Sequence, residues 1–114
     1  MFETYQRQVD GIVSQFETPY WQPLEILARL TEETGEVARI TNHMYGAKKK
    51  KTDENMQNLG EELVDVMYTV ICYANSQGIN LDSAWSDKMK KQSIRDKDRF
   101  AKKGTDIGSI VEGI

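Results

Sequence analysis

Acidic residues occupy positions at which an amphipathic helix of this sequence should carry aliphatic side chains. Wrapped at about 100° per residue, the segment from residue 26 to residue 44 gathers its large apolar side chains in one narrow arc. These apolar residues are Ile26, Val37, Ile40 and Met44. Glu33 falls inside the same arc, and Glu36 lies one turn further along at its edge, because residues three apart on a helix are neighbours. A carboxylate in a packed stripe needs a cation, so the pattern predicts two oxygen ligands that face the core.

A second pair of carboxylates lies on an even more apolar segment. From Leu63 to Ala74 the chain is apolar almost all the way round, and Asp65 is its only charged residue, which predicts a helix buried on most sides. An isolated ionised carboxylate there would take up a proton, or cost several kcal/mol, unless it is paired or bound to a metal. Glu62 precedes Asp65 by one helical turn. We therefore expect Glu62 and Asp65 to share a site with the first pair.

The chemistry of these four ligands selects the metal. All four offer hard carboxylate oxygens, and neither short acidic motif, residues 32–36 or residues 61–65, contains a histidine or a cysteine. Such a donor set favours Mg²⁺ or Mn²⁺ over zinc, copper or an iron–sulfur cluster. We expect Mg²⁺ as the cofactor, with Mn²⁺ as a substitute.

Composition limits the class of protein. The 114 residues suit one domain spanning residues 1–114, and so short a chain gains from oligomerisation because a partner covers apolar surface. Hydrophobic residues make up 39% and the net charge is −3, as in an ordinary soluble protein and unlike a general nucleic-acid binder. No stretch has transmembrane length, and the first residues lack a signal-peptide pattern, so we expect a cytoplasmic protein without a membrane or nucleic-acid partner. The single Cys72 excludes an intramolecular disulfide and is expected to be a packing residue.

Apolar residues spaced at threes and fours predict helices that end at prolines and glycines. The first helix carries one buried stripe and ends before Pro19. The stripe consists of Phe2, Tyr5, Val9, Ile12, Val13 and Phe16. The second helix begins at Pro23 and runs to about Tyr45, where Gly46 supplies a left-handed cap.

The second half of the chain is also helical. A third helix starts near Thr52 or Asp53, or alternatively after Asn58, and it runs to about Gln77, where Gly78 closes it. No alternating strand pattern exceeds a few residues. The predicted fold class is therefore all-α, a bundle of four to five helices.

A fourth helix and two irregular segments complete the prediction. The helix is capped by Asn80 or Asp82 and extends to roughly Phe100. Lys48–Lys51 form an exposed loop that serves solubility or, alternatively, closes over phosphates as a lid. The tail after Lys103 either frays or docks on a partner chain.

Basic residues line one face of the fourth helix. They recur at spacings of three, four and four, at Lys88, Lys91, Arg95 and Arg99. A row of this kind binds phosphate oxygens well, arginine through its planar fork. Lys91 and Arg95 are the foremost candidates for a phosphate site. The alternative is a solvated helix end in which the cations are balanced by Asp87, Asp96 and Asp98.

Four further residues are candidates that also have an ordinary structural explanation. Glu32 and Glu61 precede the inward pairs, and each either reaches the metal or its water or simply faces solvent. His43 lies on the same side of its helix as Glu36 and either faces a ligand or packs. Trp21 either stacks on a nucleobase or packs in the core.

The two acidic segments together match a known pattern. Glu-Glu-x-x-Glu at residues 32–36, followed by Glu-x-x-Asp at residues 62–65, resembles the signature of MazG-like nucleotide pyrophosphohydrolases. The similarity extends from about Trp21 through Phe100 and is strongest to the short, single-domain branch. The resemblance implies an all-α NTP-pyrophosphatase fold assembled as a homodimer or homotetramer. It also implies Mg²⁺-dependent hydrolysis of nucleoside triphosphates to a monophosphate and pyrophosphate, as in housecleaning of the nucleotide pool.

The resemblance assigns roles to individual residues. The implied metal ligands are Glu33, Glu36, Glu62 and Asp65. Glu32 is implied as an additional ligand or as the group that orients the attacking water. The implied substrate contacts are Lys91, Arg95 and Arg99 for the phosphates, and Trp21 and His43 for the base.

Several other functions remain as alternatives. A non-catalytic Mg²⁺-nucleotide sensor would keep the same site, and phosphoribosyl-ATP pyrophosphohydrolysis would use the same fold. A ferritin-like di-iron bundle normally pairs Glu-x-x-His motifs, and neither acidic segment has that histidine. A purely structural dimeric bundle would gain nothing from buried acids and would keep its thermal stability on chelation.

Overall fold

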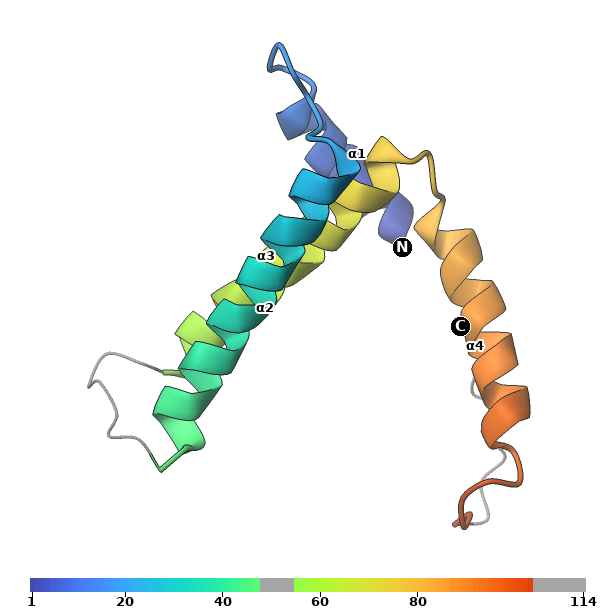
Figure 1. Cartoon of the computed structure of the whole chain (residues 1–114). Coiled ribbons are helices and arrows are strands. Elements are labelled where there is room, and N and C mark those ends of the chain that lie inside the picture. The colour runs from blue at the N-terminus through green and yellow to red at the C-terminus, as the bar shows by residue number, and fades with distance from the viewer. Residues whose placement is uncertain (48–54, 104–114) are drawn as a thin grey trace.

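The computed structural model describes residues 1–47 and 55–103. Within these ranges the chain forms helices and no strand, which confirms the all-α class (Figure 1). The helices are α1 (Phe2–Val13), α2 (Pro23–Tyr45), α3 (Met56–Ser76) and α4 (Leu81–Asp96). The predicted Lys48–Lys51 loop and the tail after Lys103 lie outside the described residues.

The ends of α2 and α3 follow from proline, glycine and asparagine chemistry. Helix α2 begins at Pro23 as predicted, because proline lacks the N–H that the first helical residue would leave unbonded. The predicted left-handed cap at Gly46 is wrong, since its backbone is extended, with φ −80° and ψ 174°. Gly78 does adopt a positive φ of 67° after α3, in the region that glycine enters without a steric penalty.

Two other predicted boundaries need correction, and one residue predicted for the stripe of α1 lies outside that helix. Helix α3 begins at neither predicted start but at Met56, because Asn55 Oδ1 accepts a hydrogen bond from Asn58 N at 3.1 Å and caps the helix. Helix α1 stops at Val13, so Phe16 lies beyond the helix and is exposed. Helix α4 ends at Asp96 and does not reach Phe100.

The four helices are arranged as two arms. Helices α2 and α3 run antiparallel and pack along their length, and α1 crosses α3 at one end of this pair (Figure 1). Helix α4 contacts α1 and then runs away from the α2–α3 pair as a second arm. The Cα radius of gyration is 17.9 Å, whereas a compact chain of this length has a value of about 13 Å. The single chain is therefore extended.

The core lies where α1 packs on α3. Val9 and Val13 of α1 pack against Ile71 of α3, and partly buried side chains complete this cluster, namely Tyr20, Cys72 and Leu81. Burial raises the pKa of the Cys72 thiol, as expected for a packing cysteine. Ile26 and Ile40 of α2 are also buried.

The expectation that residues 63–74 are buried on most sides is wrong for the single chain. In this helix Thr69, Ile71 and Ala74 are buried. Several large apolar side chains of the same segment are exposed, namely Leu63, Val64, Met67, Tyr68 and Val70. The reason is that α1 and α2 cover only part of α3, while α4 diverges and leaves the rest open. None of the described helices is long and apolar enough to cross a membrane.

Candidate active site

The antiparallel packing of α2 and α3 brings the two acidic segments together. Glu33 of α2 and Glu62 and Asp65 of α3 each offer a carboxylate oxygen, and these oxygens lie within 4.8 Å of one another. Glu33 and Glu62 are partly buried, whereas Asp65 is exposed in the single chain. Three carboxylate oxygens gathered in this way offer the donor chemistry of a site for a hard divalent cation.

The pKa of Glu62 shows that bringing these negative charges together is unfavourable. Burial raises the pKa of the Glu62 carboxyl above its ordinary value of 4.5, and the neighbouring Asp65, Glu36 and Glu33 carboxylates raise it further. Arg39 acts in the opposite direction. The site therefore favours a proton or a bound cation at Glu62.

Glu36 takes a different position from the other three acids. Its Oε2 accepts a hydrogen bond from Arg39 Nε at 3.0 Å, one turn along α2. Arg39 also contacts His43 Nδ1 through its Nη1, at 3.4 Å. The structure therefore places Glu36 next to the cluster, close enough to affect Glu62, but paired with an arginine.

Arg29 pairs with Glu33 as Arg39 pairs with Glu36. Its Nε lies 3.1 Å from Glu33 Oε1, and its Nη1 lies 3.8 Å from Glu32 Oε2. The Glu33 side chain is 14% exposed and that of Glu32 is 69% exposed. Glu32 therefore faces solvent beside the cluster, while Glu33 points into it. The Arg29 guanidinium carbon also lies 5.8 Å from the centroid of the Trp21 ring.

The acidic cluster borders a cavity of about 580 Å³. Glu33 and Asp65 form its acidic end. Its other walls are largely aromatic and apolar, including Val13, Phe16, Tyr20, Trp21, Ile26 and Tyr68. A cavity of this size and lining is typical of a small-molecule site with a few placed polar groups.

Tyr20 fixes one wall of this cavity through a polar network. Its hydroxyl donates to Asp10 Oδ1 at 2.6 Å and accepts from Asn75 Nδ2 at 3.0 Å. Burial and the hydrogen bond to Asp10 raise the pKa of Tyr20 to about 12. Asn75 is held in turn by Gln6, whose Nε2 donates to Asn75 Oδ1 at 2.8 Å. Helices α1 and α3 and the loop before α2 thus share one network.

The structure does not bring all the predicted substrate contacts to this cavity. Trp21 lines it, but His43 is buried further along α2 and is not among its lining residues. Lys91 and Arg95 belong to α4, in the other arm, and Arg99 follows that helix. Within one described chain these three cations are therefore separated from the acidic cluster.

Two arginines were missed by sequence reasoning. Arg29 stands four residues before Glu33, and Arg39 three residues after Glu36, spacings at which opposite charges pair on a helix. That spacing could have identified both residues as partners of predicted ligands. The contact between Arg29 and Trp21 could not be found in this way, because Trp21 precedes the helix.

Known proteins are similar to this chain in fold and sequence. Residues 22–100 match the MazG nucleotide pyrophosphohydrolase domain. YpjD of Bacillus subtilis is 46% identical over 98 residues, which cover 86% of this chain and 88% of that protein. Its crystal structure matches with a TM-score of 0.75 and 43% identity over 80% of this chain and 93% of that one.

A second solved structure agrees with the first. The Bacillus-conserved MazG protein, a nucleotide pyrophosphohydrolase, matches with a TM-score of 0.70 and 41% identity, covering 80% of this chain and 87% of that one. A domain match over more than half of the chain and relatives at this level of identity together show the family. The chain belongs to the MazG family of nucleotide pyrophosphohydrolases, hydrolases that act on nucleotides.

Proposed function

We propose that residues 1–114 act as one domain that hydrolyses nucleoside triphosphates, ribo or deoxyribo, between the α and β phosphates with the help of Mg²⁺. The supporting observation is the cluster of Glu33, Glu62 and Asp65 at the acidic end of an aromatic-walled cavity. Carboxylates suit Mg²⁺, a bound Mg²⁺ in turn binds phosphate oxygens, and aromatic walls suit a base. In this proposal the enzyme works in the cytoplasm and removes unwanted nucleotides from the pool.

The residues of the cluster fit the proposed metal. Glu33, Glu62 and Asp65 would hold it, and Glu36 would join them when its carboxylate leaves Arg39. The raised pKa of Glu62 supports the fit, because four neighbouring carboxylates need a compensating positive charge. Mn²⁺ would substitute for Mg²⁺, since both prefer oxygen ligands.

The reaction needs few protein groups. When bound, the metal would lower the pKa of water and offset the charge of the triphosphate. The oxygen of water forms a bond to the α-phosphorus, the bond from that phosphorus to the bridging oxygen breaks, and pyrophosphate leaves with the bond's electron pair. In this proposal Glu32, which is exposed beside Glu33, orients the water and passes its proton to solvent. The cavity behind the cluster would hold the base against Trp21.

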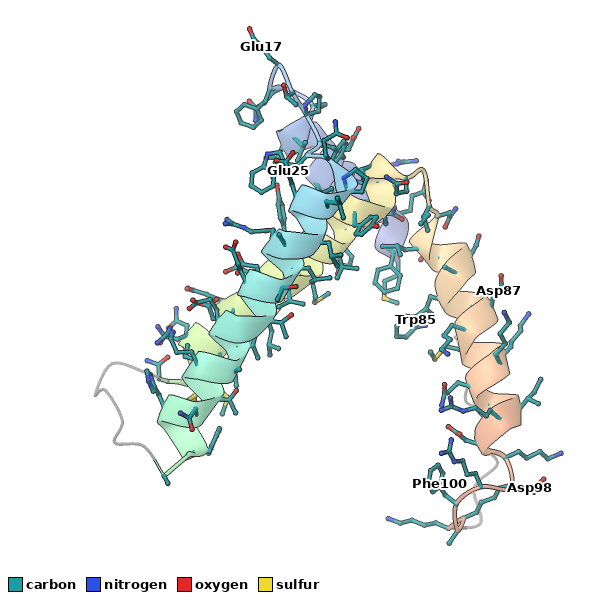
Figure 2. The ribbon with its side chains drawn as sticks, viewed as in Figure 1. Glu17, Glu25, Trp85, Asp87, Asp98 and Phe100 are labelled. Atoms are coloured by element: carbon teal, nitrogen blue, oxygen red, sulfur yellow. The ribbon has the colours of Figure 1, made fainter. Side chains whose placement is uncertain are left out.

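A second copy of the chain would complete the site. Much of α3 is exposed and apolar, and the chain is extended. On α4, Trp85 projects toward the other arm and Asp87 points away from it (Figure 2). A partner packed between the two arms would cover this apolar surface, and its own Lys91 and Arg95 would then approach the acidic cluster of the first copy. We propose a homodimer as the smallest active unit, with a dimer of dimers as its extension.

Pyrophosphate release tests the proposal. The protein is given a panel of canonical and modified NTPs and dNTPs, together with phosphoribosyl-ATP, in Mg²⁺ or in EDTA. We expect release that depends on Mg²⁺ and that falls on the order of 10²–10³-fold in Glu33→Gln. Glu25→Gln, an acid in the first turn of the same helix, is the matched control and should keep full activity. Release that persists in EDTA or in Glu33→Gln would contradict the assignment.

A non-catalytic nucleotide sensor is the second candidate, because the same cluster and cavity would bind a nucleotide without turnover. It predicts Mg²⁺-dependent nucleotide binding by calorimetry with no release across the whole panel.

A further inference from the structure

Arg29 joins the acidic cluster to the aromatic wall of the cavity. Its Nε lies 3.1 Å from Glu33 Oε1, and its guanidinium carbon lies 5.8 Å from the Trp21 ring centroid. The Arg29 side chain is 49% exposed, so it has room to move, whereas Glu33 is 14% exposed. One side chain thus contacts both a carboxylate proposed for the metal and a ring proposed for the base.

A metal ion would compete with Arg29 for Glu33. An ion held by Glu33, Glu62 and Asp65 would draw on the same Glu33 carboxylate that Arg29 contacts. The Arg29 guanidinium, bonded to the same carboxylate, would then face a divalent cation at short range in a partly desolvated site. Both the sharing of Glu33 and the repulsion between like charges weaken the Arg29–Glu33 pair when the metal binds.

We propose that Arg29 is a metal-responsive positioning residue, an inference that rests on the function proposed above. Before the metal binds, Arg29 neutralises Glu33. After the metal binds, the guanidinium leaves Glu33, stays stacked on Trp21, and turns its donors into the cavity toward the incoming nucleotide. Metal binding in this way prepares the aromatic wall of the cavity for the base of the substrate.

The surroundings of Arg29 support such a movement. Glu32 Oε2 lies 3.8 Å from Arg29 Nη1, so a guanidinium that leaves Glu33 keeps an exposed counter-charge nearby. Arg29 and Trp21 both line the cavity, so donors released from Glu33 are already at its wall. An arginine suits this role because its planar group stacks and donates at the same time, whereas a lysine ammonium offers no flat face.

Trp21 provides a direct probe, because the chain contains only two tryptophans, Trp21 and Trp85. Trp85 contacts Phe2 with ring centroids 5.4 Å apart, and Trp85→Phe retains an aromatic ring at that position. In the Trp85→Phe protein, all tryptophan fluorescence comes from Trp21. The experiment titrates Mg²⁺ into this protein without nucleotide and follows the emission of Trp21.

We expect a saturable, Mg²⁺-dependent change in Trp21 emission that is lost when either Arg29→Met or Glu33→Gln is added. Arg29→Lys should give less than half of the change. Arg7→Met is the matched control, because Arg7 and Glu3 form an arginine–glutamate pair of the same i,i+4 spacing on α1. That variant should respond fully, and circular dichroism should show equal helix content in all of them.

The outcomes separate this inference from the proposed function. Mn²⁺ binding is measured in parallel by the loss of the free-ion paramagnetic resonance signal. The proposed role of Arg29 is wrong if Mn²⁺ binds but Mg²⁺ does not change the emission of Trp21. It is also wrong if adding Arg29→Met leaves the Mg²⁺-dependent change in emission unaltered. Both results leave the proposed metal site unaffected. Absence of metal binding overturns the metal site itself and this inference with it.

Kinetics give a second, independent readout in the active protein. A residue that positions the substrate should affect binding more than turnover, so Arg29→Met should raise KM for the nucleotide about tenfold with a much smaller effect on kcat. If kcat falls and KM is unchanged, Arg29 only orients Glu33, and the proposal is wrong.

Discussion

The carboxylate of Asp82, in the first turn of α4, caps the first helix of the chain through the backbone of Phe2. The Phe2 N–H donates to Asp82 Oδ1 at 2.8 Å, although the two residues are 80 positions apart. The Glu3 N–H donates to Asp82 Oδ2 at 3.1 Å, and the N-terminal ammonium lies 3.3 Å from Oδ1. Asp82, one of the two caps predicted for α4, therefore fixes α4 to α1, while Asn80 caps α4 by accepting from Ser83 N at 3.1 Å.

Replacing Asp82 with alanine should loosen the junction between the two arms. The hydrogen bond from Phe2, with those from Glu3 and the N-terminus, holds the pKa of Asp82 below its ordinary value of 3.8. Its contribution to stability is therefore present above that value and lost as the pH falls through the lowered pKa. At pH 7 we expect the melting temperature of Asp82→Ala to be several degrees below that of the wild type. This difference in melting temperature should disappear in acid. Asp87→Ala, on the same helix, should show no such pH-dependent gap.

Glu62 should behave in the opposite way. Because its pKa is raised in the folded protein, its contribution to stability is present below the ordinary value of 4.5 and lost as the pH rises through the raised pKa. Without metal, Glu62→Gln should therefore have a higher melting temperature than the wild type at pH 7.5. In acid the two proteins should have the same melting temperature. Added Mg²⁺ should raise the melting temperature of the wild type but not of this variant. Glu61→Gln is the control, and an equal Mg²⁺ effect in Glu62→Gln would count against Glu62 as a ligand.

Mixed dimers should reveal whether the cations come from the partner copy. Neither Glu33→Gln nor the double variant Lys91→Ala, Arg95→Ala should be active alone. In a mixed dimer, the acids of one chain and the cations of the other form one intact site, so random mixing should restore about a quarter of wild-type activity. If the acids and the cations act within one chain, the mixture stays inactive. The measurement is pyrophosphate release after the two variants are refolded together.

Tyr20→Phe should weaken the wall of the cavity. The variant loses the hydroxyl that joins Asp10 to Asn75, which should cost about 1 kcal/mol in urea unfolding at pH 7. In the wild type, the neutral hydroxyl contributes stability below the ordinary pKa of 10.0, and this is lost as the pH rises through about 12. The difference between the two proteins should thus disappear in that range. Tyr5→Phe, an exposed tyrosine on α1, should match the wild type throughout.

Local chemistry explains which helix boundaries could be predicted. Both ends of α2 were found, because Pro23 suits the first helical turn and a glycine follows Tyr45, although Gly46 is extended and does not form the left-handed cap on which that end was predicted. The start of α3 was missed because several residues in that region can cap a helix, and only the geometry at Asn55 shows which one does. Phe16 continues the apolar spacing of α1 but lies outside it, since spacing alone does not show where the backbone leaves the helix.

The sequence by itself determined that the chain is helical and that Glu33 lies on an inward-facing stripe, because helical periodicity fixes which side chains share a face. Only the tertiary structure decided which surfaces meet. In the folded chain Glu33 lies close to Glu62 and Asp65, and Arg29 lies between that cluster and Trp21. Lys91 lies on α4, away from the cluster. The physical reason is that periodicity identifies an apolar face but not the helix that covers it, and that choice depends on contacts between residues far apart in the chain, such as Asp82 with Phe2.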